Sequence, residues 1–79
     1  MKKIILSDYR MIKFCIKKFK IYYDRALYSK NKEHIELCIK YAKGLKPNGE
    51  MISKRCSVIV SFIIKNFYRE RYQIILSER

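Results

Sequence analysis

A chain of 79 residues is long enough for one domain and no more. Its hydrophobic content of 49% argues against a disordered protein, and two glycines and one proline are too few for a sheet with many tight turns. Lys and Arg total 19 against seven Asp and Glu, and the resulting net charge of +12 indicates an acidic partner: nucleic acid, anionic lipid or an acidic protein.

The cysteines and the N-terminus favour a reducing, intracellular location. Cys15, Cys38 and Cys56 are odd in number and form no C-x-x-C pair, so they do not resemble a secreted disulfide framework. The first residues open like a signal peptide, but Asp8 cuts the apolar stretch short. The longest apolar cluster, Val58–Ile64, is too short to span a bilayer. We therefore expect a cytoplasmic protein without a membrane span.

The first predicted helix runs from Ser7 to about Tyr28. Ser7 can cap it, and Asp8 suits the positive end of the helix dipole. A basic row with helical spacing lies beside its apolar stripe and consists of Arg10, Lys13, Lys17 and Lys20. The stripe itself has spacings of three and four and consists of Ile12, Cys15, Ile16, Phe19, Tyr22, Tyr23, Ala26 and Leu27.

Two large apolar residues of this helix fall outside its stripe. Phe14 and Ile21 are seven residues apart on the other side. Either the helix is packed on two sides, or these residues meet something outside the monomer. Burying both across an interface could contribute roughly 3–5 kcal/mol. Because three helices give a chain this short a thin core, we expect a homodimer or another partner on this side.

The second predicted helix is short. Asn31 is a suitable N-cap, Glu33 suits the first turn, and Gly44 fits the left-handed position that ends a helix. The expected inner face consists of Ile35, Cys38, Ile39 and Ala42.

The third predicted helix is long and begins near Asn48 to Met51, with Asn48 as the favoured cap. Its expected inner stripe consists of Ile52, Cys56, Ile59, Val60, Ile63, Phe67 and Ile74. Its opposite side consists of Lys54, Ser57, Ser61, Lys65, Tyr68 and Tyr72. The fold class is thus all-α, a single three-helix domain (long–short–long) over residues 1–79. The β-branched residues of Ser57–Ile64 keep a strand open there, and Lys2–Leu6 and Gln73–Ser77 are alternative short terminal strands.

Catalysis and metal binding find little support in the residues. His34 is the single histidine and has no partner that would tune it as a general acid or base. The cysteine spacings match no zinc pattern, and each cysteine falls on the apolar stripe of a different helix, as a small core residue would. Two glycines flanking a proline cannot build a phosphate loop. We expect no enzymatic activity, no cofactor and no metal.

The segment from Ile35 to Phe67 suggests a helix–turn–helix, although its loop, Gly44–Gly49, is longer than the usual turn. The first hypothesis is therefore a nucleic-acid-binding protein, a dimeric DNA-binding regulator of that type. Lys54, Ser57, Ser61 and Lys65 would face the groove, and Arg10, Lys13, Lys17 and Lys20 would contact phosphates.

The alternative hypothesis is a protein-interaction module, such as a small inhibitor that docks on a larger acidic host protein. Its contact anchors would be Phe14, Ile21, Phe62 and Tyr68. In style, though by no motif, the chain resembles the small AT-rich reading frames of phages and mobile elements.

Overall fold

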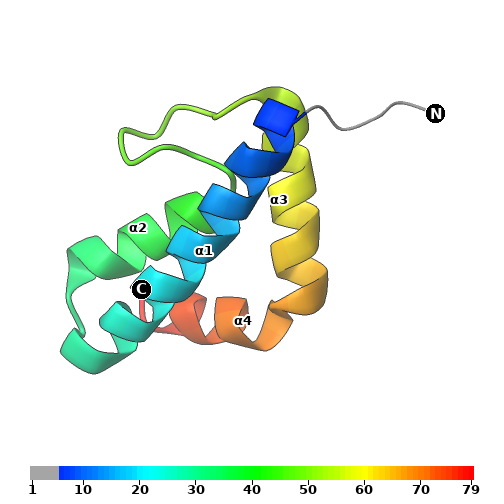
Figure 1. The fold of residues 1–79 in the computed structure, drawn as a ribbon. Helices are drawn as coiled ribbons and strands as arrows, with labels where there is room; N and C mark the ends of the chain where they lie inside the picture. The colour runs from blue at the N-terminus through cyan, green and yellow to red at the C-terminus, as the bar shows by residue number, and fades with distance from the viewer. Residues whose placement is uncertain (1–5) are drawn as a thin grey trace.

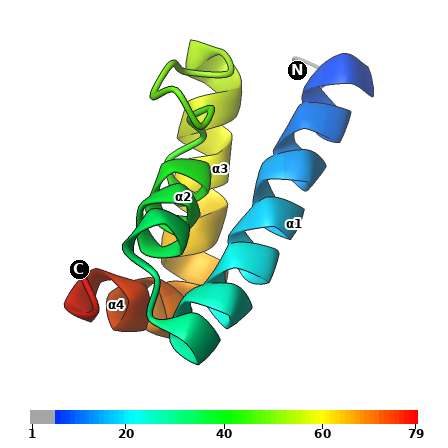
Figure 2. The same cartoon turned by 90° about the vertical axis from the view of Figure 1, so that its left-hand side faces the viewer.

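The computed structural model describes residues 6–79, and this range folds into four helices. They are α1 (Leu6–Ser29), α2 (Lys32–Ala42), α3 (Lys54–Phe67) and α4 (Arg69–Ser77). The helix α1 crosses diagonally in front of α2 and α3, and α4 lies across the end where α1 finishes and α2 begins (Figure 1). When the molecule is viewed after a quarter turn, α1 forms one side and α2 and α3 form the other (Figure 2). The all-α class is confirmed, but the expected number of helices was too small.

The turn between α1 and α2 follows the sequence prediction. Asn31 caps α2, because its side-chain oxygen accepts a hydrogen bond of 2.8 Å from the Glu33 backbone N–H. Only Lys30 and Asn31 separate the two helices, and Lys30 adopts a left-handed backbone (φ 58°) to reverse the chain. So short a connection makes α1 and α2 antiparallel neighbours. The predicted inner face of α2 is buried throughout: Ile35, Cys38, Ile39 and Ala42.

Gly44 ends α2 in the left-handed conformation that the sequence predicted (φ 73°). Its carbonyl accepts two hydrogen bonds, one from the Ile52 backbone N–H at 3.1 Å and one from the Ser57 hydroxyl at 2.7 Å. An isolated antiparallel bridge between Leu45 and Met51 closes the loop. The loop is therefore fixed at its base to both α2 and α3.

The start of α3 lies later in the chain than expected. Ser53, and not Asn48, is the N-cap, since its hydroxyl accepts a hydrogen bond of 3.1 Å from the Cys56 backbone N–H. Asn48 instead accepts a bond from the Glu50 backbone N–H within the loop. Ser57–Ile64, for which a strand was an alternative, is helical.

The core draws on all four helices. The three cysteines are free and buried, as predicted from their places on three apolar stripes. Burial raises the pKa of Cys15 to about 11 and that of Cys38 to about 12, so both thiols stay protonated at neutral pH. The largest fully buried side chains are Phe19, Ile39, Ile64, Ile75, Val60, Cys15, Cys38 and Cys56.

The long third helix of the prediction is wrong, because the chain bends at Tyr68. This residue leaves the helical region (φ −126°, ψ 31°) while its N–H still bonds to Ile64 O, and α4 starts at the next residue. The bend carries Tyr72 and Ile75 into the core. Gln73–Ser77 is part of α4 and not a strand. Of the other candidate strand, residues 2–5 lie outside the described range and Leu6 begins α1.

The rotation of α3 about its axis also differs from the prediction. Cys56, Val60 and Ile64 form the buried line, whereas Phe67, expected inside, is 74% exposed. Ile74 is likewise exposed, and Tyr72, expected outside, is buried. Ser57 was expected outside as well, but the bond to Gly44 holds it inside. Ile59 and Ile63 pack only at the edge of the core.

Two ion pairs join the residues that follow α4 to the turn between α1 and α2 and to α2 itself. Lys30 Nζ lies 2.6 Å from Glu78 Oε1, and Arg79 Nε lies 3.3 Å from Glu36 Oε2. Both pairs join residues more than 40 positions apart in the sequence, so they help to fix the position of α4 after the bend. Within residues 6–79, no helix combines the length and the apolar character needed to cross a membrane.

Candidate nucleic-acid interface

The basic row of α1 is exposed along its whole length. Its members are Arg10, Lys13, Lys17 and Lys20, and at 1.5 Å per residue the row extends over roughly 15 Å. Lys13 Nζ lies over the Tyr9 ring, 5.2 Å from its centroid. The stem of this lysine is thus held along the helix while its charge remains in water.

Four carboxylates within residues 6–79 pair with cations that do not belong to the α1 row. Across residues 6–79, the ion pairs join Asp8 to Arg55, Glu36 to Arg79, Glu50 to Lys46 and Glu78 to Lys30. Arg55 contacts Asp8 at 2.6 Å, so one carboxylate of α1 is already neutralised by α3. No member of the α1 row takes part in these pairs. The row therefore keeps its charge for an external anion.

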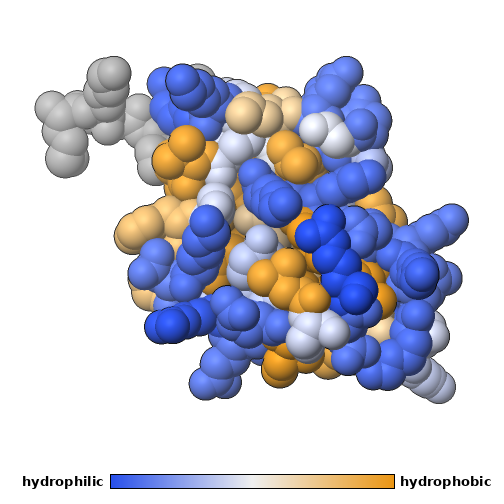
Figure 3. Space-filling model, turned by 180° about the vertical axis from the view of Figure 1, so that it is seen from behind, coloured by the Kyte–Doolittle hydropathy of each residue, from blue (hydrophilic) through white to orange (hydrophobic). Residues whose placement is uncertain are grey.

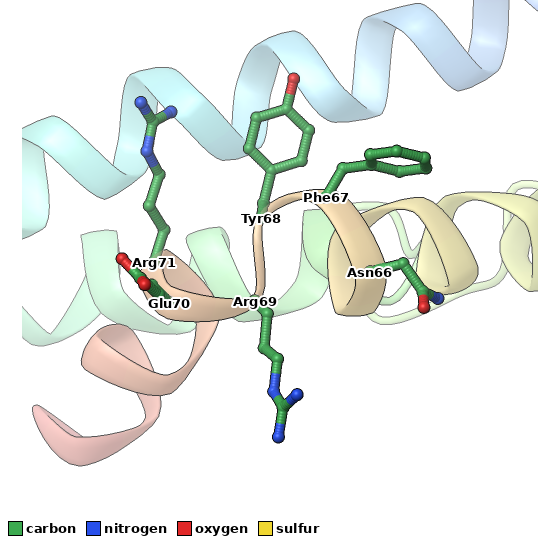
Figure 4. Close-up of a pocket in the computed structure, with 6 residues that line it drawn as sticks. All are labelled: Asn66, Phe67, Tyr68, Arg69, Glu70 and Arg71. Carbon is green, nitrogen blue, oxygen red and sulfur yellow. The ribbon is translucent and has the colours of Figure 1, made fainter.

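A cluster of aromatic rings and cations continues the row onto α4; we call it the Tyr68 cluster, and it consists of Lys20, Tyr23, Tyr68 and Arg71. Lys20 Nζ lies 5.0 Å from the Tyr68 ring centroid, and the Arg71 guanidinium lies 5.6 Å from the same centroid. The Arg71 guanidinium also lies 5.7 Å from the Tyr23 ring. Tyr68 and Arg71 both extend toward α1 (Figure 4). Such cation–π contacts orient the cations without neutralising them.

The core holds the Tyr68 cluster in place. The fully buried ring of Phe19 lies 6.1 Å from that of Tyr68, edge to face, and 6.2 Å from that of Tyr23, stacked. Both distances fall within the range of favourable aromatic pairs. The two tyrosines are therefore rigid supports for Lys20 and Arg71. Because Lys20 belongs to both groups, the α1 row and the Tyr68 cluster form one continuous cationic surface.

The predicted groove-facing set of α3 is only partly right. Lys54 and Lys65 are exposed and Ser61 is partly exposed, but the placement of Ser57 outside is wrong, since Ser57 is 6% exposed. Its hydroxyl donates to Gly44 O and is not available to a base edge. No cation–π contact or ion pair within residues 6–79 joins this set to the α1 row.

The connection between α2 and α3 also argues against a helix–turn–helix. Residues 43–53 separate the two helices, whereas the motif requires a turn of about three or four residues. At the bend between α3 and α4 the connection is the single residue Tyr68, and α4 is short. Neither junction has the geometry of the motif.

Sequence reasoning placed Phe67 in the core and left Arg69 out of the candidate site. Both are exposed beside Tyr68, in a hollow at the α3–α4 bend lined by Asn66, Phe67, Tyr68, Arg69, Glu70 and Arg71 (Figure 4). Arg69 extends to the side opposite Tyr68 and Arg71. Phe67 was predicted to lie inside because the predicted helix continued straight past Tyr68. Only the pairing of two arginines with adjacent aromatic residues hinted at this surface.

The four predicted protein-contact anchors differ in exposure and in their neighbours. The ring of Phe14 is 49% exposed and packs edge to face on Tyr41 of α2, with centroids 6.1 Å apart. Ile21 is partly buried. Phe62 on α3 is 61% exposed, and Tyr68 belongs to the Tyr68 cluster. Seen from behind, hydrophobic side chains form separate patches on a mainly hydrophilic face (Figure 3).

His34 and the cysteines contribute no reactive group to this surface. His34 Nδ1 lies 3.4 Å from the Ser29 hydroxyl, and the imidazole ring lies 5.6 Å from the Tyr22 ring. In the part of the chain that the structure describes, no three His, Cys, Asp or Glu side chains gather closely enough to hold a metal ion. Comparisons with family models, curated proteins and solved structures give no match.

Proposed function

We propose that this protein binds nucleic acid through its phosphate backbone and carries out no reaction on it. The observation that carries the proposal is the meeting of the unpaired α1 row with the Tyr68 cluster at Lys20. Rows of exposed Lys and Arg neutralise phosphates and release condensed counterions. The net charge of +12 adds long-range attraction. The proposed mode of binding is not that of a helix–turn–helix.

Binding should depend steeply on salt concentration. The proposed phosphate contacts are Arg10, Lys13, Lys17, Lys20, Arg69 and Arg71. If each neutralises one phosphate, the slope of log affinity against log salt should approach about −5 on duplex DNA and about −4 on a single strand. Fluorescence anisotropy of labelled oligonucleotides, titrated at several salt concentrations, measures this slope. No binding of either form at about 50 mM salt would refute the proposal.

Charge reversal within the row supplies the matched comparison. Lys13→Glu with Lys17→Glu should make the salt slope shallower by about 2 and weaken binding by at least about tenfold at low salt. The control is Lys32→Glu with Lys43→Glu, which changes the net charge equally at two exposed residues at the two ends of α2. If both pairs weaken binding equally, net charge and not the α1 row determines affinity.

A protein contact on α3 is the second candidate function. Val58 and Phe62 lie one helical turn apart and are 63% and 61% exposed. If this pair joins two copies, the wild type should sediment as a dimer, and Val58→Lys with Phe62→Lys should sediment as a monomer. Phe14→Glu with Ile21→Lys tests the other predicted dimer surface in the same way. A wild type that stays monomeric at about 100 µM, far above the Kd of a stable dimer, excludes the homodimer.

A further inference from the structure

We infer that Phe67 is a stacking platform for an unpaired nucleobase, so that the ligand of the cationic surface is single-stranded nucleic acid. The inference rests on the proposed function and adds the class of ligand. Its basis is the position of Phe67 at the bend, next to Tyr68. There the exposed ring of Phe67 borders the cations that would hold phosphates.

The bend between α3 and α4 is what exposes Phe67. In a straight helix this residue would continue the inner stripe, but the chain turns at Tyr68 and the ring is left 74% exposed. The hollow beside it has a volume of about 400 Å³, within the size range of small-molecule sites. A phenylalanine left in water forgoes the hydrophobic stabilisation that burial would give it. A planar apolar ligand would recover part of this free energy.

The charges around Phe67 are arranged to suit a nucleotide. Tyr68 and Arg71 extend toward α1, where Lys20 joins them, and Arg69 extends from the other side of the bend (Figure 4). Cations therefore lie on both sides of the hollow. Glu70, also in the lining, repels phosphate. A base is thus favoured inside the hollow and phosphates at its edges.

Stacking on Phe67 requires a base that is not already stacked. In a duplex both faces of each base are covered by its neighbours, so the ring can reach a base only at a strand end. Each base of a single strand offers a free face, and stacking of one base on an aromatic ring strengthens binding about tenfold or more. The other exposed phenylalanines lack this setting: Lys18 covers the Phe14 ring at 5.5 Å, and no cation is stacked on Phe62 in the described range.

The decisive experiment compares strands that have the same phosphates with and without bases. Anisotropy titrations would use labelled deoxyribose and ribose strands of about 12 nucleotides, an abasic strand and a duplex of the same length. Phe67→Ala should weaken binding of both base-bearing strands about tenfold and leave the abasic strand and the duplex unaffected. Tyr28→Ala, at an aromatic residue of α1 that is 84% exposed and belongs to neither the α1 row nor the Tyr68 cluster, should change none of these affinities. The tighter of the two base-bearing strands identifies the natural source of the ligand.

A direct reading of stacking comes from Phe67→Trp, because the chain has no tryptophan of its own. Its fluorescence should be quenched by the base-bearing strand and not by the abasic strand. Equal affinity of wild type and Phe67→Ala for single strands overturns the inference, as does equal binding of the abasic strand. Either result, with steep salt dependence retained, leaves the proposed function standing. Absence of binding to every nucleic acid rejects the proposed function instead.

Discussion

Gly44→Ala should lower the free energy of unfolding by about 3–5 kcal/mol, a large part of the total for a domain of this size. A Cβ at Gly44 would lie 2.5 Å from the Ser57 Cα, which is backbone and cannot move without shifting α3. The left-handed backbone adds about 1–2 kcal/mol for any residue with a Cβ. The bond from the Ser57 hydroxyl to Gly44 O, worth about 1 kcal/mol, would also be strained.

Gly49→Ala is the matched control for this prediction. Gly49 also has a positive φ, of 92°, but a Cβ there would have no atom within 4 Å apart from those of Gly49 and its two chain neighbours. Its replacement should cost only the backbone strain, about 1–2 kcal/mol. Urea unfolding followed by circular dichroism gives both values. Equal losses in the two variants would show that the contact between Gly44 and Ser57 contributes nothing.

Stability should also fall as the pH rises from about 9 to about 12. Burial raises the pKa of Cys15 from its ordinary 9.0 to about 11, and that of Cys38 to about 12. A thiol that holds its proton more tightly in the folded state stabilises that state. This stabilisation is complete below pH 9 and is lost as the pH rises through the folded pKa values. For Cys15 alone the full effect is roughly 3 kcal/mol.

The measurement is the urea midpoint at a series of alkaline pH values, compared with that of Cys15→Ala plus Cys38→Ala. The double variant should start less stable, because it leaves cavities, but should lose less stability as the pH rises. Lysine neutralisation reduces self-repulsion equally in both proteins, so the difference between them isolates the thiols. Parallel curves would mean that the two thiols do not determine the alkaline limit.

Local signals made the first half of the fold predictable. Asn31 and Gly44 mark the two ends of α2 because a cap and a left-handed turn are properties of single residues. The cysteines fall on apolar stripes and are buried as expected. Ser53 as the cap of α3 was missed because Asn48 lies nearby and is an equally good capping residue.

The bend at Tyr68 could not be predicted from local sequence. No glycine or proline is near it, and the residues facing inward keep helical spacing across it: Ile64, Tyr68, Tyr72 and Ile75. The contacts that accompany the bend are with distant residues: Tyr72 and Ile75 enter the core, and Glu78 forms an ion pair with Lys30.

In the candidate site, too, some features follow from local sequence and others depend on contacts between distant segments. The spacing of the basic residues in α1 was enough to predict the α1 row. The Tyr68 cluster joins Lys20 to Arg71, 51 positions later, and exists only because α4 folds back across the end of α1. The burial of Ser57 likewise depends on Gly44, which periodicity within α3 cannot reveal. Contacts between distant segments thus determine which polar residues are exposed to solvent.

Phe19 belongs to the core and also packs directly beneath the cationic surface. Its ring is fully buried, yet it touches both tyrosines on which Lys20 and Arg71 rest. Aromatic rings shift the magnetic resonances of neighbouring nuclei, so a change in the tilt of Tyr68 or Tyr23 alters the signals of Phe19. The resonances of the buried Phe19 ring should therefore report on ligand binding at the cationic surface, without an attached label.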